Sequence, residues 1–449
     1  MTIRLEHMLA AMLLVAAPLS AQDAPSDGSG EPSESPPPAA AQPRPVVIQN
    51  IRPADQRGLD VFEPPKEPGA AYDGFELDWG GAFTQQYQAL AHENAAAPKP
   101  VAGVDANELM DIGPGFNNAT ANLDLNAQLA PGIRVALTTY LSSRHHQETW
   151  VKDGYLLIDA SPLDVEILND LMSVLTVKVG HFEVDYGDAH YRRTDNGNAI
   201  HNPFVGNLIL DAFTTQIGAH VYARKDGLLA MAGLTGGEIK GEIRYPERRG
   251  PAYLAKLGFD RHLTDELRVR LTGSFFRQPK AISNTLYGGD RAGSRYYFVM
   301  ENTAATTTAQ AWSGSINPGF SSDVSAVMVN PYVQAGRFGL FGTFERAEGR
   351  AASEPEDRVW RQYAGDGVIR FAGDDAYVAA RLALAEGELT GIEGEVRVER
   401  TQLAAGWFVT PNVLFKGELV WQSYDGFPTT DIRSGGAFDG LVVEGVVAF

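Results

Sequence analysis

The sequence predicts an all-β protein, a transmembrane antiparallel β-barrel of about 16 strands with an inward-folded third loop. Three observations support this fold class. Apolar and polar residues alternate over segments long enough to cross a bilayer, which takes about 9–11 tilted residues. The connections between these segments alternate between short and long. No long apolar run follows the N-terminal region, so a transmembrane helix is not expected.

The first 21 residues have the pattern of an export signal. Arg4 precedes the short apolar run "MLAAMLLVAAP", and "LSA" before Gln22 has the small-x-small form of a cleavage site. The run is too short to anchor the chain in a bilayer. Residues 1–21 are therefore predicted to be a signal peptide.

A tail rich in Pro, Ser, Gly and Glu follows, beginning "QDAPSDGSGEPSESPPP". Such a composition cannot bury a core, so residues 22–70 are predicted to be a disordered periplasmic tail. Two roles are open for it: a passive spacer, or a segment that binds another envelope component. The outer-membrane barrel is then expected to occupy residues 71–449.

The first predicted strand, 75–89, shows the alternation clearly. Phe75, Leu77 and Trp79 lie on one face, and Glu76 begins the polar set on the other. Apolar residues outward and polar residues inward is the pattern of a strand between lipid and water.

The next two strands, 117–129 and 133–142, have the same alternation on both sides of a tight turn. Pro131 and Gly132 form this turn, because proline fixes φ and glycine has no Cβ restriction. Further strands are predicted at 150–159, 174–184, 214–223, 228–235, 252–260, 267–276, 324–333, 337–345, 358–371, 376–385, 395–409, 413–423 and 438–449. The same pattern also allows 14 or 18 strands.

The connections sort by length onto two rims. The long ones are 90–116, 185–213, 236–251 and 277–323, and each follows an odd-numbered predicted strand. Those after even-numbered strands are short, except 160–173, which reads as a partly helical periplasmic turn. Short turns on one rim and long loops on the other are typical of outer-membrane barrels.

Strand 395–409 carries an irregularity. Val396 and Val398 fall on one face, whereas Leu403 and Trp407 fall on the other. A β-bulge between the two pairs is therefore predicted.

The last strand, 438–449, ends on Phe449. It is expected to close the barrel against the first strand and to place Phe449 at the periplasmic interface, where aromatic residues are favoured. A terminal phenylalanine on an alternating strand also resembles the assembly signal of bacterial outer-membrane proteins. This resemblance implies recognition of Phe449 by the outer-membrane assembly machinery.

The connection 185–213 combines charged and apolar residues. Its charged side chains include Arg192, Arg193, Asp185, Asp188 and Asp195, and its apolar ones are Phe204, Val205, Leu208, Ile209, Leu210 and Phe213. Because the apolar half needs a surface to pack on, the loop is expected to fold against the inner wall. Arg192, Arg193, Asp195, Asp188 and His201 are then predicted to form the pore constriction, with a transverse field that filters ions and polar solutes. The alternative is a surface loop whose arginines pair with its own aspartates.

Composition excludes several function classes. The net charge of −19 makes nucleic acid a poor partner, because a protein that binds nucleic acid needs a basic surface. With no cysteine, the chain has no disulfide and no thiolate chemistry. No H-E-x-x-H, G-x-S-x-G or phosphate-loop pattern occurs, so no cofactor, metal or catalytic site is predicted.

Histidines and aspartates offer one enzymatic alternative. Five of the nine histidines lie close together in the sequence: His145, His146, His181, His190 and His201. With Asp185 and Asp188 they could form an Asp/His hydrolytic site at the rim of an outer-membrane barrel. This alternative is weighed against a passive channel.

Three stretches resemble Gram-negative porins: "LTVKVGHFEVDYG", "TPNVLFKGELVWQSYDG" and the closing "FDGLVVEGVVAF". They are similar to the strand-to-loop segment and to the last strands of the phosphate-selective porin family. This resemblance implies a 16-strand, homotrimeric outer-membrane porin that passes small hydrophilic solutes or ions by passive diffusion and is not an enzyme.

The inward-facing charges of this sequence differ from the pattern of that family, in which anion selectivity rests on an ordered ladder of Arg and Lys. The basic pore-lining candidates are Arg134, Lys178, Lys256, Arg268, Arg270, Arg381 and Lys416. The acidic ones are Glu76, Asp78, Asp124, Glu418 and Glu444. Since the two sets offset each other, phosphate selectivity is not predicted.

Overall fold

The computed structural model describes residues 52–63, 66, 72, 74–117, 119–141, 149–163, 165–238, 243–288, 295–306 and 314–449. These residues belong to one compact unit, Val46–Phe449. The predicted signal peptide, most of the predicted tail, His145 and His146 lie outside the described residues.

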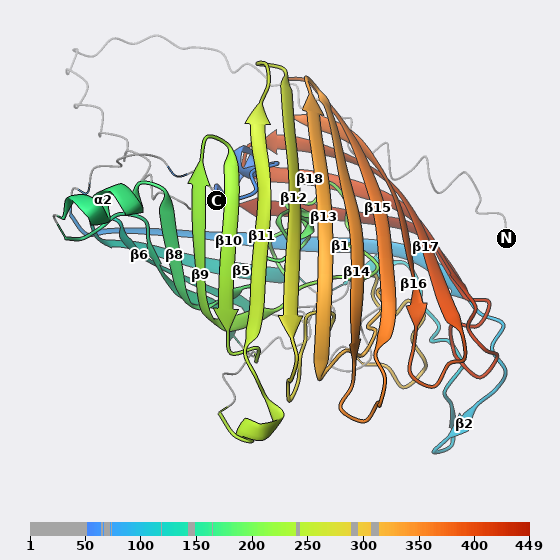
Figure 1. The fold of residues 1–449 in the computed structure, drawn as a ribbon. Coiled ribbons are helices and arrows are strands. Elements are labelled where there is room, and N and C mark those ends of the chain that lie inside the picture. Colours follow the sequence, from blue (N-terminus) through green and yellow to red (C-terminus); the bar gives the residue numbers. More distant parts are fainter. Residues whose placement is uncertain are drawn as a thin grey trace, which may run out of the picture. The chain divides into compact units, whose positions relative to one another are not determined.

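Sixteen antiparallel strands form a closed ring, which confirms the predicted fold class (Figure 1). In order around the ring they are β1 (Glu76–Glu93), β5 (Thr120–Ala130), β6 (Ile133–Leu141), β7 (Thr149–Ile158), β8 (Leu175–Glu183), β9 (Thr215–Lys225), β10 (Leu228–Thr235), β11 (Ala252–His262), β12 (Leu267–Gln278), β13 (Asp323–Ala335), β14 (Phe338–Arg350), β15 (Arg358–Phe371), β16 (Ala376–Glu388), β17 (Glu395–Thr410), β18 (Val413–Asp425) and β19 (Ala437–Ala448). β1 pairs with both β5 and β19, and this closes the ring.

Small elements lie outside the ring of strands or in its loops. The two-residue β4 (Gly115–Phe116) pairs with β1, and β2 (Pro100–Val101) pairs with β3 (Val104–Asp105). The helical turns are η2 (Gln56–Gly58), α2 (Glu166–Met172), η3 (Ala189–Arg192) and η4 (Pro246–Arg248). No helix among the described residues is long and apolar enough to cross a membrane.

The two faces of the sheet differ as the alternation predicts. On β16, Leu382 points outward and is 66% exposed, whereas its neighbour Arg381 points inward and is 4% exposed. Large apolar residues are exposed on the outer face all around the ring, among them Leu77, Trp79, Leu123, Leu257, Leu340, Leu403 and Phe415. The outer face is therefore suited to hydrocarbon, and charged groups lie inside.

The two rims also agree with the predicted parity. Turns such as 131–132, 336–337 and 411–412 are short, and 184–214 and 279–322 are long loops on the opposite rim. α2 lies in the one longer connection of the short-turn rim, where a partly helical turn was predicted.

The predicted bulge in β17 is wrong. Residues 395–408 pair with β16 and β18 without interruption, and the register shifts only between Phe408 and Thr410. Val396 and Val398 point inward and are fully buried, because loops fill the barrel at this end and supply apolar neighbours.

One boundary of the predicted domains is also wrong. Residues 52–63 and Lys66, expected to be part of the disordered tail, contact the barrel interior. Charged side chains and the single ring of Phe62 supply the contacts of this segment, and composition could not show that its charges match charges on the wall.

We predict that Leu382→Arg, at the middle of β16, destabilises the barrel folded in a bilayer and lowers its free energy of unfolding by about 2–4 kcal/mol. The reason is that a charge on the lipid face must be buried in hydrocarbon. Glu393→Arg, an exposed change in the loop after β16, is the control and should have little effect. Urea titration of folding in lipid vesicles measures both. Equal effects would contradict a lipid-facing position for Leu382.

Candidate functional site

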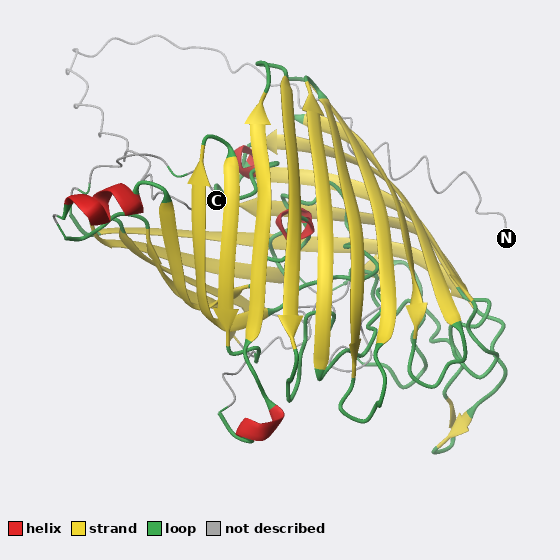
Figure 2. Ribbon diagram, in the orientation of Figure 1, coloured by secondary structure: helices red, strands yellow, loops and turns green. Residues whose placement is uncertain are grey.

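The loop between β8 and β9, residues 184–214, crosses the interior of the barrel. Its contacts reach inward-facing residues on β1, on β12 and on β18. η3 lies within this loop, behind the front strands in Figure 2. The apolar residues that needed a surface are buried: Phe204, Val205, Ile209, Leu210 and Phe213. These contacts agree with the predicted inward loop.

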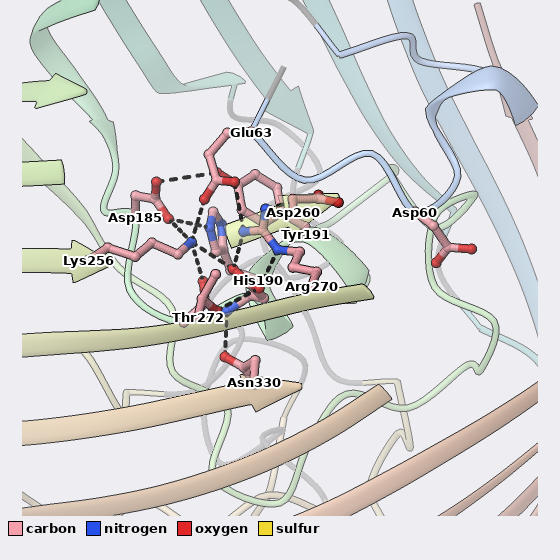
Figure 3. Close-up of polar contacts among 12 residues, drawn as sticks. Asp60, Glu63, Asp185, His190, Tyr191, Lys256, Asp260, Arg270, Thr272 and Asn330 are labelled. Carbon is pink, nitrogen blue, oxygen red and sulfur yellow. Dashed lines mark hydrogen bonds and ion pairs between the residues drawn. The ribbon is translucent and has the colours of Figure 1, made fainter. Parts of the chain in front are cut away.

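Asp188 anchors the loop to β11, β12 and β13 (Figure 3). Its carboxylate accepts hydrogen bonds from Arg270 Nε and Nη2 at 2.7 and 2.8 Å and from the Thr272 hydroxyl at 2.7 Å. Lys256 Nζ lies 2.8 Å from the same carboxylate, and the Asp188 N–H donates to the Asn330 side chain at 2.7 Å. A buried carboxylate needs such partners, because desolvation costs several kcal/mol per ion.

His190 bridges a carboxylate at the end of β8 and one of the loop. Its Nδ1 lies 3.3 Å from Glu183 and its Nε2 3.1 Å from Asp185, which also binds Lys256 Nζ at 2.6 Å. Burial lowers the pKa of His190, but its hydrogen bonds to Asp185 and Glu183 outweigh burial and raise the pKa above its ordinary value. The imidazolium therefore balances charge within the loop.

The middle of the loop is anchored on the opposite wall. The Gly197 carbonyl accepts a hydrogen bond from Thr84 Oγ1 on β1 at 2.7 Å. Asp195 forms a buried ion pair with Lys152 on β7. The loop therefore spans the lumen from β12 to β1 and β7.

The last part of the loop rests on β16 and β18. Lys416 Nζ donates to three loop carbonyls at 2.7–2.9 Å, those of Ala199, Asn202 and Phe204. Glu418 accepts from the Val205 N–H at 2.7 Å, and Arg381 Nη1 donates to the Gly206 carbonyl at 3.2 Å.

The two predicted constriction arginines have separate partners. Arg193 donates to the Asp211 carboxylate from Nε at 2.9 Å and from Nη2 at 2.6 Å, and lies 3.6 Å from Asp195. Arg192 pairs with Asp60, outside the loop. Burial raises the pKa of Asp60, but Arg192 and a further arginine outweigh it and lower the pKa to about 2. Only Arg193 pairs with the loop's own aspartates, as the alternative reading of the loop expected.

A second loop also fills the lumen and was missed. Residues 279–322 were predicted only as a long connection, but Tyr287 donates to Glu345 and Tyr296 donates to Glu418, both at 2.5 Å. The Phe213 N–H donates to the carbonyl of Leu286 at 2.8 Å, so the two loops contact each other. The tyrosines of "TLYGG" and "RYYFVM" were the available signal, since amphipathic rings favour a half-polar interior.

A third inward segment, residues 52–63, was missed as well. Phe62 is 1% exposed, and Glu63 contacts Lys256 and Arg270, each at 2.7 Å. His201, predicted in the constriction, contacts this segment through the Pro53 carbonyl at 3.2 Å. Burial lowers the pKa of His201 well below its ordinary value, so the ring is neutral.

Little space is left where these segments meet the wall. A cavity of about 20 Å³ lies beside Tyr186, His190, Arg193, Asp211, Met328 and Arg381. A second, of about 10 Å³, lies beside Asp60, Arg192, Tyr332 and Arg370. Each holds on the order of one water molecule, whereas an unfilled barrel of 16 strands encloses an aqueous channel.

The predicted pore-lining residues all lie on the inner face but contact protein groups. Arg134 pairs with Asp159, and Arg268 pairs with Asp260 at 2.6 Å. Lys178 Nζ lies 4.1 Å from the ring centroid of Tyr155. The others, Arg270, Arg381, Lys416 and Glu418, hold the inward loop as described above.

Three of the candidate hydrolytic residues, His190, Asp185 and Asp188, lie inside the barrel against β11 and β12. His181 lies near the end of β8, with its Nε2 2.9 Å from Thr215 Oγ1 on β9. Within the described ranges, no group of three or more His, Cys, Asp or Glu has an arrangement that could hold a metal ion.

Comparison with known proteins supports the fold. No protein-family model and no curated protein matches the chain. The outer membrane channel DcaP of Acinetobacter baumannii has a TM-score of 0.53 at 9% identity, with 84% of this chain and 99% of that chain covered. The anion-selective porin from Comamonas acidovorans has a TM-score of 0.51 at 12% identity, covering 84% and 100%. OmpT of Vibrio cholerae, described as an outer-membrane expressed protein, has a TM-score of 0.49 at 13% identity, covering 84% and 99%.

These likenesses show the fold, that of outer-membrane porins and channels. Together with the apolar outer face, they place this barrel in an outer membrane. The resemblance to porins is confirmed at the level of fold, whereas the phosphate-selective family is not shown.

We predict that His190 makes the stability of the barrel pH-dependent. Because its pKa is raised in the folded state, its contribution is fully present below the unfolded pKa of about 6.5 and is lost as pH rises through the folded pKa. The free energy of unfolding should therefore fall as pH rises through the folded pKa of His190. His190→Gln should remove this slope, and His262→Gln, an exposed change at the end of β11, should keep it. Urea unfolding at a series of pH values measures the slope, and an unchanged slope in His190→Gln would refute the prediction.

Proposed function

We propose that this protein is an outer-membrane channel for the passive diffusion of small hydrophilic solutes or ions. The observation that carries the proposal is the distribution of charge: in a closed ring of 16 strands, buried charged residues such as Arg270, Lys416 and Glu418 face the lumen, and large apolar residues such as Leu257 and Leu382 are exposed on the outer face. Such a wall solvates polar solutes and excludes lipid. The fold shared with a channel and a porin is consistent with this role.

Selectivity is proposed to depend on the loop 184–214. Arg192, Arg193 and Asp195 lie near the middle of the inward segments, each in contact with an opposite charge. Nearly balanced charge in the lumen favours polar solutes without a strong preference for one sign. A homotrimer and recognition of Phe449 by the assembly machinery stay predictions of the sequence.

Reconstitution into planar bilayers tests the proposal. Discrete ohmic current steps in salt solution support a channel. A silent bilayer together with hydrolytic activity of the folded protein would instead support the alternative, a barrel enzyme using His190 with Asp185. His190→Ala separates the two further, since an enzyme would lose its activity and a channel would still conduct.

We predict that replacing Arg192 and Arg193 together by Ala shifts ion selectivity towards cations. The two substitutions remove one positive charge from beside Asp60 and one from beside Asp211, so the lumen becomes more negative by two charges. The reversal potential in a salt gradient measures the shift. Arg346→Ala is the control, because Arg346 is exposed and pairs with Glu348 outside the lumen. An unchanged reversal potential in the double variant would place the loop outside the conduction path.

A further inference from the structure

Residues 52–63, which we name the strap, lie across the barrel at its short-turn end. On one side the Gln56 N–H donates to the carbonyl of Pro411, in the β17–β18 turn, at 2.9 Å. On the other side Lys66 Nζ, just after the strap, donates to the carbonyl of Asp159 beside β7 at 2.6 Å. Figure 1 shows the strap as the blue segment within the ring of strands. The strap therefore spans the mouth from β17 to β7.

Two carboxylates of the strap are held by four cations. Asp60 pairs with Arg192 of the inward loop and with Arg370 of β15 at 2.8 Å, and Glu63 pairs with Lys256 of β11 and Arg270 of β12, each at 2.7 Å. Figure 3 shows Glu63 above Lys256 and Arg270, and Asp60 further along the strap. The cations come from four different elements, so the strap is fixed across the mouth and not along one wall.

Phe62 is the one large apolar side chain among these anchors. Its ring is 5.4 Å from Tyr332 and 6.3 Å from Phe341, measured between centroids, and Arg270 lies 4.3 Å from its centre. Aromatic packing of this kind holds a side chain in one place. The other apolar side chains of the strap, those of Ala54, Leu59 and Val61 besides Pro53, are only half-buried.

The strap is held mainly by side-chain contacts and not by the backbone hydrogen-bond ladder that holds the strands of the barrel. Its ordered secondary structure is the three-residue turn η2, and none of its residues joins the strand ladder of the ring. Ion pairs of buried groups gain little overall when the alternative is full hydration, because desolvation offsets most of their attraction. If the strap moves into water, its carboxylates and the four wall and loop cations become hydrated. The interaction therefore allows exchange between bound and released states.

We propose that the strap is a releasable plug of the short-turn mouth, and that its release both opens this mouth and uncovers Arg192, Arg370, Lys256 and Arg270. This rests on the proposed channel function. The strap carries Asp55, Asp60 and Glu63 against Arg52 and Arg57, so its release removes a net charge of −1 from the mouth. The open state therefore prefers anions more than the closed state does. Lys66 and β1 keep the released strap attached to the barrel.

The first test changes the strap anchors in the full chain. In the variant Asp60→Asn/Phe62→Ala/Glu63→Gln, the ratio of closed to open dwell times in planar bilayers should fall about tenfold or more for each buried pair broken. The reversal potential should shift towards that of the anion. Asp265→Asn is the matched control, since Asp265 is an exposed acid on the same rim without contact to the strap.

A reversible cross-link tests whether the strap itself causes the change. The protein has no cysteine, and Gln56 Nε2 lies 3.5 Å from Asp375 Oδ1, at the ends of the two side chains. Because a direct disulfide needs closer Cβ atoms, thiols at the two positions are joined by a short, reducible bifunctional reagent. This reagent should restore closed behaviour when Gln56→Cys/Asp375→Cys is added to the release variant, and a reductant should reverse it. Opening that persists in the cross-linked protein would overturn the proposal.

A second readout does not depend on conduction. The thiol of Phe62→Cys should be alkylated by a water-soluble maleimide at least about tenfold faster with Asp60→Asn/Glu63→Gln than without them. Equal alkylation rates, or conducting channels whose dwell times match wild type, would overturn the strap proposal. Faster alkylation with silent bilayers in every variant would instead uphold the strap and overturn the channel function.

Discussion

Every structural feature of this protein depends on the pairing of β1 with β19. In hydrocarbon a backbone N–H or C=O without a partner costs several kcal/mol, so a sheet can span the bilayer only without edges. Residues from Ala82 to Glu93 pair with β19, and Glu76 to Thr84 pair with β5, so one strand completes the ladder on both sides. Closure in turn fixes one face of each strand towards lipid and the other towards the lumen.

A ring of this size encloses more space than its own side chains can fill. Three segments from different parts of the chain enter it: residues 52–63, 184–214 and 279–322. Their polar groups match those on the wall: Asp188 pairs with the opposite charge of Arg270, and Glu418 accepts hydrogen bonds from the Tyr296 hydroxyl and the Val205 N–H. The lumen is therefore a polar interior in which most of the described buried charges have partners of opposite sign.

The three segments also depend on one another. Arg192 belongs to the inward loop yet binds Asp60 of the strap, and Lys256 and Arg270 each contact both Glu63 of the strap and a carboxylate of the loop. A change in one segment alters the charge that the others experience. The residues that would set ion selectivity thus also hold the strap across the mouth, so a change in these residues affects both the selectivity and the closure of the mouth.

The sequence alone determined the strands and their faces, because alternation has a period of two and is a local property of neighbours such as Leu382 and Arg381. It also determined the parity of the rims and the inward direction of loop 184–214, whose apolar half has no other surface. It misplaced Val396 and Val398 and missed the strap and the loop 279–322. Only the tertiary structure decided these, since ion pairs such as Glu63–Lys256 join residues far apart in the chain, and no local pattern encodes which charges meet.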